Sequence, residues 1–150
     1  MKKLIVFIML LCTACGHSNR NNMVDFTYAD NIPILGDTIN QEVVHFIVDT
    51  GANISLIDTK YYNDNKNRFL SLQEMEMRMF GIGGISETRM SHTVILNTSL
   101  GRCKFQDSDL SVVIKQVNRL GYNVIGLIGS DFLKDDYVVN YKTKQISKCN

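Results

Sequence analysis

The stretch "IVDTGANISLID", residues 47–58, places one carboxylate in a short polar turn between two apolar runs. The run before the turn is "VVHFIV" and the run after it is "NISLID", and both carry the β-branched residues typical of strands. Asp49, Thr50, Gly51 and Ala52 are therefore predicted to form a turn at the end of a strand. Because turns at strand ends often carry function, Asp49 is the first candidate for a reactive group.

Short strands are predicted on both sides of this turn. Before it, "VDFTYAD", "IPILGDTI" and "VVHFIVD" are rich in β-branched and aromatic residues and are separated at Gly36-Asp37 and at Asn40-Gln41. After a polar interval that fits a surface loop with room for a short helix, alternation resumes at Met75 and continues through "CKFQDSDLSVVI". The closing segment "DYVVNYKTKQISK" predicts a hairpin with its turn at residues 142–144.

These patterns predict a mainly antiparallel β fold, a single closed or strongly curved barrel with one short helix at "SDFLKDD". Ser130 or Asp131 could cap that helix. A chain of 150 residues is large enough for one such domain but not for two, and 45% hydrophobic residues indicate a globular protein. The formal net charge is +1 without a basic or acidic block, so electrostatics give no support for a nucleic-acid partner.

The first residues are typical of a secretory signal. Met1-Lys2-Lys3 is a positive segment, and the apolar run that follows is too short to span a membrane. The stretch "LLCTACG" resembles the lipobox of bacterial lipoproteins, in which Cys15 would be lipidated and become the new N-terminus. Cleavage near Ala14 without lipidation stays open as an alternative. The expected organisation is a signal peptide over residues 1–14, a lipidated tether over 15–23 and one domain over 24–150.

The absence of an acid directly after Cys15 favours the outer membrane of a bacterial envelope, facing the periplasm, for a lipoprotein of this type. Removal of the signal and lipidation would leave Cys103 and Cys149 as the pair that an oxidising compartment could join. A disulfide between them and two unpaired thiols are equally compatible with this count. The cysteine spacing fits no zinc motif, and we expect no metal or cofactor.

The apolar strand, the sequence Asp-Thr-Gly-Ala and the second apolar strand together resemble the active-site segment of retropepsin-like aspartic proteases. "FGIGG", residues 80–84, resembles the glycine-rich tip of the family's flap, and "GLIGSDFL", residues 126–133, resembles its apolar-apolar-glycine segment followed by a short helix. A closing hairpin follows, as in bacterial and cellular members. The resemblance covers roughly residues 25–147 and, with four elements in order, is more specific than the tripeptide alone.

The resemblance implies an aspartic endopeptidase that acts on a peptide or protein substrate. Hydrolysis of a peptide bond by acids needs two carboxyl groups about 3 Å apart that share one proton. Because the chain contains one Asp-Thr-Gly, the second acid would come from a second copy of Asp49 in a homodimer. In the family, the residue matching Thr50 hydrogen-bonds across the two-fold axis, and Gly51 lets backbone donors approach the carboxylates.

The resemblance also assigns supporting roles. The flap tip would contain Ile82, Gly83 and Gly84, whose glycines allow the hairpin to open and close over a peptide. The segment Leu127, Ile128 and Gly129 would be structural, with Gly129 allowing close packing behind the acid. Such glycines are also common in ordinary tight turns.

Several candidates also have a structural interpretation. Asp49 could be an Asx-turn residue, and Asp58 and Asp131 could be caps. His17, His45 and His92 are scattered, which favours satisfied surface or core histidines. Tyr61 and Tyr62 are expected to pack against the barrel. The alternative function is therefore a catalytically inactive envelope lipoprotein of the same fold that binds peptides or serves as an assembly module.

Overall fold

The computed structural model describes residues 23–81 and 84–149, apart from the side chains of 70–73, 75 and 77–89. The predicted signal peptide, Cys15, His17 and the flap residues Ile82 and Gly83 lie outside this part of the chain. In chain order the elements are β1 (Met23–Asp25), β2 (Thr27–Ala29), β3 (Ile32–Ile39), β4 (Glu42–Val48), β5 (Leu56–Asp58), α1 (Thr59–Asp64), the 3-10 helix η2 (Lys66–Arg68), β6 (Leu70–Gly81), β7 (Gly84–Thr98), β8 (Gly101–Ser108), α2 (Ser111–Asn118), β9 (Val124–Ile128), α3 (Ser130–Leu133), β10 (Tyr137–Asn140) and β11 (Gln145–Lys148).

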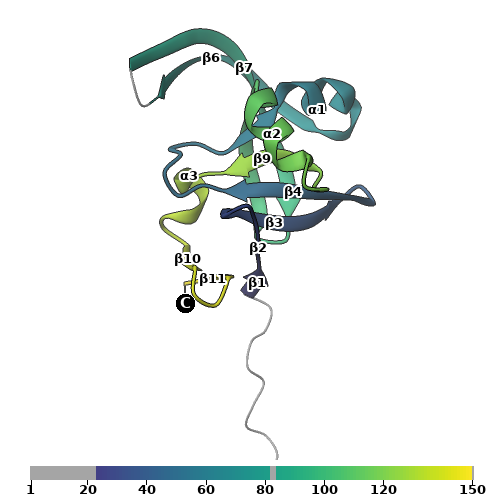
Figure 1. The fold of residues 1–150 in the computed structure, drawn as a ribbon. Helices are drawn as coiled ribbons and strands as arrows, with labels where there is room; N and C mark the ends of the chain where they lie inside the picture. Colours follow the sequence, from purple (N-terminus) through teal and green to yellow (C-terminus); the bar gives the residue numbers. More distant parts are fainter. Residues whose placement is uncertain (1–22, 82–83, 150) are drawn as a thin grey trace, which may run out of the picture.

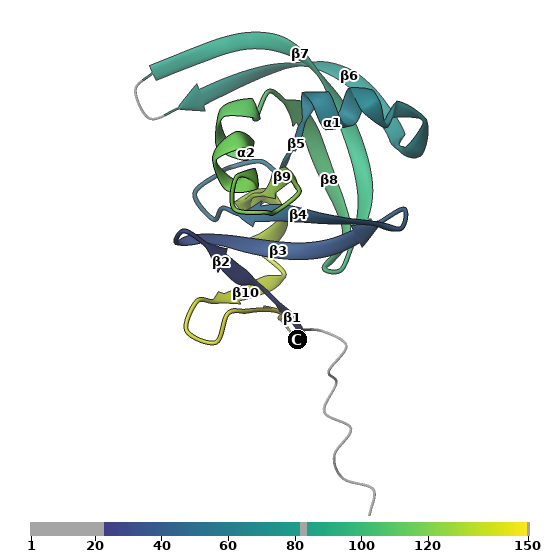
Figure 2. The ribbon, with the colours of Figure 1, turned by 45° about the vertical axis from the view of Figure 1, so that its right-hand side comes forward.

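The strands form two sheets. The larger sheet has the order β2-β3-β4-β9-β5-β8-β7-β6, and the smaller has the order β1-β11-β10. At the centre of the larger sheet, β4 pairs parallel with β9 and β5 pairs parallel with β8, while neighbouring pairs are antiparallel. Figures 1 and 2 show strongly curved strands at one end of this sheet and the β6–β7 hairpin projecting beyond the body of the domain. The predicted mainly β class is confirmed, and β2 and β6 are the two edges of this sheet in the described chain.

Two-residue turns join β2, β3 and β4. Asp30, Asn31, Asn40 and Gln41 all have positive φ angles, as the hairpin turns that match the twist of strands require. The turn predicted at Asn40-Gln41 is confirmed, since Ile39 pairs with Glu42.

The break predicted at Gly36-Asp37 is wrong, because β3 continues through both residues, which pair with His45 and Val44. The Asp37 carboxylate accepts hydrogen bonds from the backbone N–H groups of Thr38 and Ser99. Its polar side chain therefore ties β3 to the β7–β8 turn instead of marking a turn of its own.

The predicted single short helix is present as α3, but the described chain contains two further α-helices. The strand predicted through "SVVI" is wrong, because these residues begin α2. Leu110, Ile114 and Val117 recur at helical spacing and pack against the buried clusters, whereas Val112 is 83% exposed. The β-branched residues favour a strand locally, but the segment forms a helix because the residues that contact the sheet recur at helical spacing.

The polar interval contains α1 and η2, and β6 begins at Leu70, five residues before the predicted start. Asp58 caps α1, as predicted, because its side chain accepts a hydrogen bond from the Tyr61 N–H. Tyr62 is buried in the main core and Tyr61 packs against it, so their predicted packing role is confirmed.

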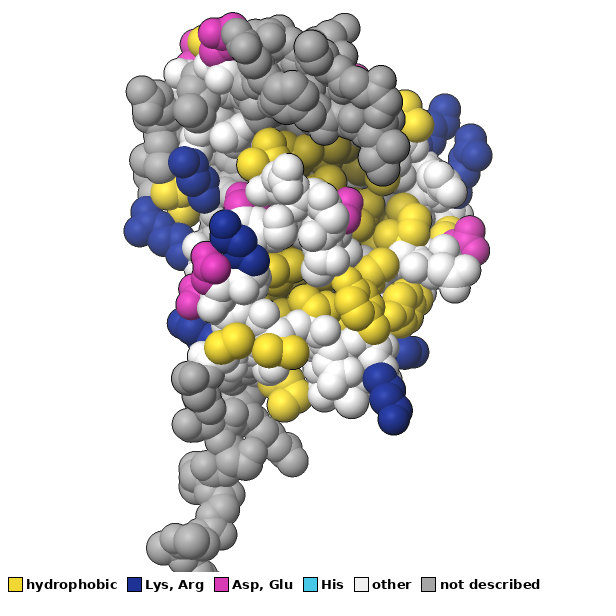
Figure 3. Space-filling view, turned by 90° about the vertical axis from the view of Figure 1, so that its left-hand side faces the viewer, with side chains coloured by type: hydrophobic (Ala, Val, Ile, Leu, Met, Phe, Trp, Pro, Cys, Tyr) yellow, Lys and Arg dark blue, Asp and Glu magenta, His cyan; other side chains and the backbone are white. Residues whose placement is uncertain are grey.

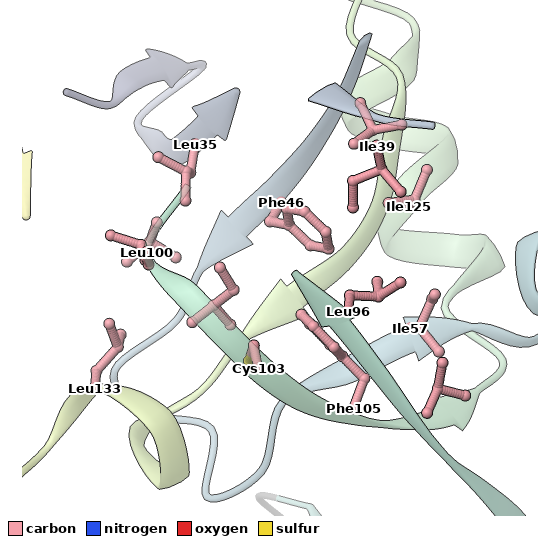
Figure 4. Close-up of a cluster of buried hydrophobic side chains, with 14 of the residues drawn as sticks. Leu35, Ile39, Phe46, Ile57, Leu96, Leu100, Cys103, Phe105, Ile125 and Leu133 are labelled. Carbon is pink, nitrogen blue, oxygen red and sulfur yellow. The ribbon is translucent and has the colours of Figure 1, made fainter. Parts of the chain in front are cut away.

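The main hydrophobic core is formed mostly by side chains of the larger sheet, and Ile146 of the smaller sheet joins it. Phe46 from β4 stacks on Phe105 from β8 at its centre, and Ile57, Leu96 and Ile125 close around them (Figure 4). These side chains come from strands far apart in the sequence, which makes the core a product of the sheet order.

The closing hairpin of β10 and β11 is confirmed. β11 also pairs with β1, so the first and last strands of the described chain share one small sheet with Ile146 buried on its inner face. In the described part of the chain, no helix is long and apolar enough to cross a membrane.

Candidate active site

Asp49 directly follows β4, at the centre of the larger sheet. Its backbone N–H donates to the carbonyl oxygen of Ile128 at 3.0 Å, which extends the β4–β9 pairing by one step. The Ile128 side chain is fully buried, and Leu127 packs against two smaller clusters. The Asp49 residue itself is exposed, so a buried parallel strand pair presents the carboxyl group to solvent.

Residues 49–52, here called the acid loop, are organised by their own backbone. The Gly51 N–H donates to Asp49 Oδ1 at 3.0 Å, and the Ala52 N–H donates to the Asp49 carbonyl oxygen at 3.1 Å. The Asx-turn considered for Asp49 is therefore present. It fixes one carboxylate oxygen without burying the side chain, so it is compatible with a reactive role.

The start of α3 holds the far end of the acid loop. The Ser130 N–H and hydroxyl both donate to the Ala52 carbonyl oxygen, at 2.8 and 2.9 Å. At Gly129, an added Cβ would lie 2.6 Å from the Ile54 carbonyl oxygen and 2.9 Å from that of Ala52. The close packing expected at Gly129 is present, because the backbone at Gly129 lies directly against the backbone of Ala52 and Ile54.

Ser55 is a supporting residue that the sequence interpretation missed. Its hydroxyl donates to Asp131 Oδ1 at 2.7 Å and accepts from the Gly129 N–H at 3.0 Å, and the residue is 1% exposed. The available signal was a hydroxyl inside the apolar run "ISLI". Asp131 does not cap α3, whose N-cap residue is Gly129, so the predicted cap is wrong. The Asp131 carboxylate turns toward Ser55 instead.

Cys103 lies in the buried region behind Ser55. Burial raises the pKa of the Cys103 thiol to about 12, against a lowering effect of the hydrogen bond with Ser55. Cys103 is a buried free thiol and Cys149 an exposed one. Of the two arrangements left open by the sequence, the structure therefore contains the unpaired thiols.

Thr50 lies on the exposed side of the acid loop, where its Oγ1 is 3.3 Å from the hydroxyl oxygen of Tyr141. The flap region forms the long hairpin of β6 and β7, in which Gly81 pairs with Gly84. The two residues between them, Ile82 and Gly83, lie outside the described chain.

The remaining candidates have structural contacts. His45 Nδ1 accepts from the Asn123 N–H, and the His92 ring lies beside Asp107 with Nδ1 3.3 Å from Oδ1. Both agree with the expectation of satisfied histidines. Among the described residues, no group of three or more His, Cys, Asp or Glu side chains is placed to hold a metal ion.

Known proteins resemble this arrangement. A family model described as "Aspartyl protease" matches residues 37–132, which include the acid loop, the β6–β7 hairpin and Gly129. The chain belongs to this aspartyl protease family. The family resemblance inferred from the Asp-Thr-Gly-Ala turn is thereby confirmed.

Two solved protease structures are similar to this family member. The EIAV protease, solved with the inhibitor HBY-793, has 23% sequence identity and a TM-score of 0.47, and the match covers 73% of this chain and 92% of that chain. A retropepsin-like aspartic protease from Rickettsia conorii has 13% identity and a TM-score of 0.42, with 83% and 86% covered. No curated protein sequence matches the chain significantly.

The acid loop presents one carboxyl group on a fixed support. One exposed carboxyl group, Asp49, is held by Gly51 and by the end of β9, and Ser130 anchors the loop behind it. A single ionised carboxylate can accept a proton from water, but a second, protonated carboxyl group is needed to polarise the substrate carbonyl.

Proposed function

We propose that the protein is a membrane-anchored aspartic peptidase that hydrolyses peptide bonds with two Asp49 side chains, one from each chain of a homodimer. The observation that carries this proposal is an exposed carboxyl group on a loop held firmly by buried strands, in a member of the aspartyl protease family. Such rigid support is what a reacting group requires.

In the proposed reaction, the two Asp49 carboxyl groups share one proton. The ionised carboxylate takes a proton from a water molecule as that water attacks the substrate carbonyl carbon. The protonated partner donates to the carbonyl oxygen, where negative charge develops. The Gly51 N–H donates to Asp49 Oδ1 and so fixes the orientation of the carboxylate.

An exposed apolar surface supports the homodimer. Figure 3 views the side on which α3 and β10 lie in Figure 1, and hydrophobic side chains gather over much of this face. In the C-terminal hairpin, Val138 is 53% exposed and Tyr141 is 45% exposed. Apolar patches on a soluble domain are typical of interaction surfaces, and a second copy would bring the missing acid.

The peptidase proposal predicts that Asp49→Asn abolishes cleavage while leaving the fold intact, because the amide keeps the shape but neither ionises nor shares a proton. Purified wild type and variant are incubated with a diverse peptide library at several pH values, and products are identified by mass spectrometry. Circular dichroism checks that both are folded. If the wild type cleaves nothing that the variant spares, the peptidase proposal is wrong and the catalytically inactive alternative is favoured.

The membrane anchor is proposed from the lipobox-like sequence around Cys15. β1 begins at Met23, so the tether would leave the domain beside the small sheet. Two hydrophobic signals normally hold a protein firmly on a membrane, so the lipid on Cys15 would need to carry more than one acyl chain.

This anchor predicts that Cys15→Ser moves the protein from the outer-membrane fraction to the soluble periplasm, because the residue that carries the lipid is lost. Cell fractionation followed by detection of the protein measures the change. Cys12→Ser is the matched control, since that residue would leave with the signal peptide. Unchanged partitioning of Cys15→Ser would contradict the lipid anchor.

A further inference from the structure

The acid loop has a third contact besides its bonds to β9 and α3. Thr50 Oγ1 lies 3.3 Å from the hydroxyl oxygen of Tyr141, a residue 91 positions later in the chain. Tyr141 belongs to the turn of the C-terminal hairpin, between β10 and β11. Thus the hairpin turn reaches the residue that follows the acid.

The Tyr141 side chain comes from a well-fixed turn. The Asn140 side chain accepts hydrogen bonds from the backbone N–H groups of Lys142 and Thr143, both at 3.1 Å, which closes the turn around Tyr141. The Phe26 N–H also donates to the Lys144 carbonyl oxygen at 2.9 Å and joins the turn to the chain between β1 and β2.

The ring of Tyr141 is held as well. It packs edge to face against the ring of Phe26, with centroids 5.9 Å apart, and Phe26 is 5% exposed in the main core. The phenol therefore spans from a buried aromatic residue to the acid loop. Removal of its hydroxyl would leave this ring packing in place.

We propose that Tyr141 is a positioning residue that fixes the acid loop through Thr50. A catalytic effect of the Thr50–Tyr141 contact rests on the proposed peptidase function. The contact itself, which joins the hairpin to the acid loop, does not. A threonine hydroxyl has one donor and two acceptor positions, so the bond with Tyr141 leaves Thr50 able to bond to a second chain. Because the Gly51 N–H that orients the Asp49 carboxylate comes directly after Thr50, loosening Thr50 would loosen that bond.

The test uses Tyr141→Phe, Thr50→Val and the double variant of the full-length protein, with the exchange rate of the Gly51 amide hydrogen measured by NMR. Each single variant should accelerate Gly51 exchange by roughly fivefold, the factor that corresponds to one net hydrogen bond. The double variant should exchange no faster than Thr50→Val alone, because Thr50→Val already removes the bond that Tyr141→Phe removes. Unchanged exchange in Tyr141→Phe, or additive effects in the double variant, would overturn the proposal.

Tyr28→Phe is the matched control. Tyr28 packs on the same Phe26 ring at 5.7 Å, so the change removes the same atom beside the same neighbour without touching Thr50. Its Gly51 exchange should equal that of the wild type, and an equal acceleration would also overturn the proposal. In cleavage assays, Tyr141→Phe should lower kcat by roughly fivefold with KM little changed. A wild type that cleaves nothing refutes the peptidase function, while the exchange measurement still decides the role of Tyr141.

Discussion

Gly129 has no space for a side chain, because the backbone of the acid loop occupies the volume where a Cβ would stand. Its N–H is bonded to Ser55 and the following N–H to Ala52, so it cannot move away without breaking both contacts. The identity of this residue thus sets how closely α3 approaches the acid.

We expect Gly129→Ala to lower the free energy of unfolding by about 1–3 kcal/mol, the usual cost of overpacking, because the added Cβ meets rigid carbonyl oxygens. Cleavage should fall further than this loss of stability accounts for, since Ala52 moves with the loop. Urea unfolding and cleavage of one peptide measure the two effects. At Gly36 an added Cβ would meet only the His45 side chain, at 3.7 Å, so Gly36→Ala should stay close to wild type. Equal stability of both variants would contradict the packing argument.

Asp107 joins three elements at the base of the β6–β7 hairpin. From β8, its carboxylate accepts hydrogen bonds from Ser91 and His92 of β7 and from Thr59 of α1. Burial by itself would raise the pKa of Asp107, but the bonds from the His92 backbone, Thr59 and Ser91, with the electrostatic effect of His92, hold it below its ordinary value. The folded state therefore favours the ionised carboxylate.

The lowered pKa determines how stability should depend on pH. The contribution of Asp107 is fully present above its unfolded-state pKa, near 4, and is lost as the pH falls through the lower folded-state value. Asp107→Asn should lower the unfolding free energy at pH 7 by on the order of 1–3 kcal/mol. The difference in unfolding free energy between Asp107→Asn and wild type should narrow below about pH 4, because the wild-type carboxylate becomes protonated there.

Urea unfolding at pH 7 and pH 3 measures this gap. Asp64→Asn is the control, because its exposed pair with Lys60 contributes little to stability. A gap between Asp107→Asn and wild type that does not change with pH would contradict the electrostatic origin of the effect.

At the scale of the molecule, the described chain supplies one Asp-Thr-Gly loop on one curved sheet, and an acid pair needs two. In the proposed dimer each chain would contribute Asp49, so cleavage would depend on both chains. Whether cleavage needs Asp49 from both chains therefore distinguishes a site shared by two chains from a site that is complete within one chain.

Mixing wild type with Asp49→Asn tests the shared site. After denaturation and refolding of equal amounts, random association should leave about a quarter of the dimers with two Asp49 residues. Cleavage per wild-type chain should fall to about half of its value without the variant, as measured with one peptide substrate. Refolded wild type alone is the control. Activity that stays proportional to the amount of wild type would show that one chain is sufficient.

The sequence by itself determined the local features of this protein. The apolar runs around Asp49 predicted two strands with an acid between them, and Asn40-Gln41 predicted a hairpin turn. The strands follow from the pattern of apolar residues, and the turn follows from residues that tolerate positive φ angles. Both signals are local, because they involve only residues close together in the sequence. The resemblance of "GLIGSDFL" to the family segment also predicted that Gly129 packs closely behind the acid loop.

Tertiary structure alone decided the contacts between segments that are distant in the sequence. Ser55 meets Asp131 because β5 and β9 are neighbours, and Tyr141 reaches Thr50 because β1 and β11 join the two ends of the domain. "SVVI" became helical because its neighbours Leu110, Ile114 and Val117 fit the sheet at helical spacing. Periodicity describes which face of a segment is apolar, whereas the partner of that face is fixed by the order in which the strands pair.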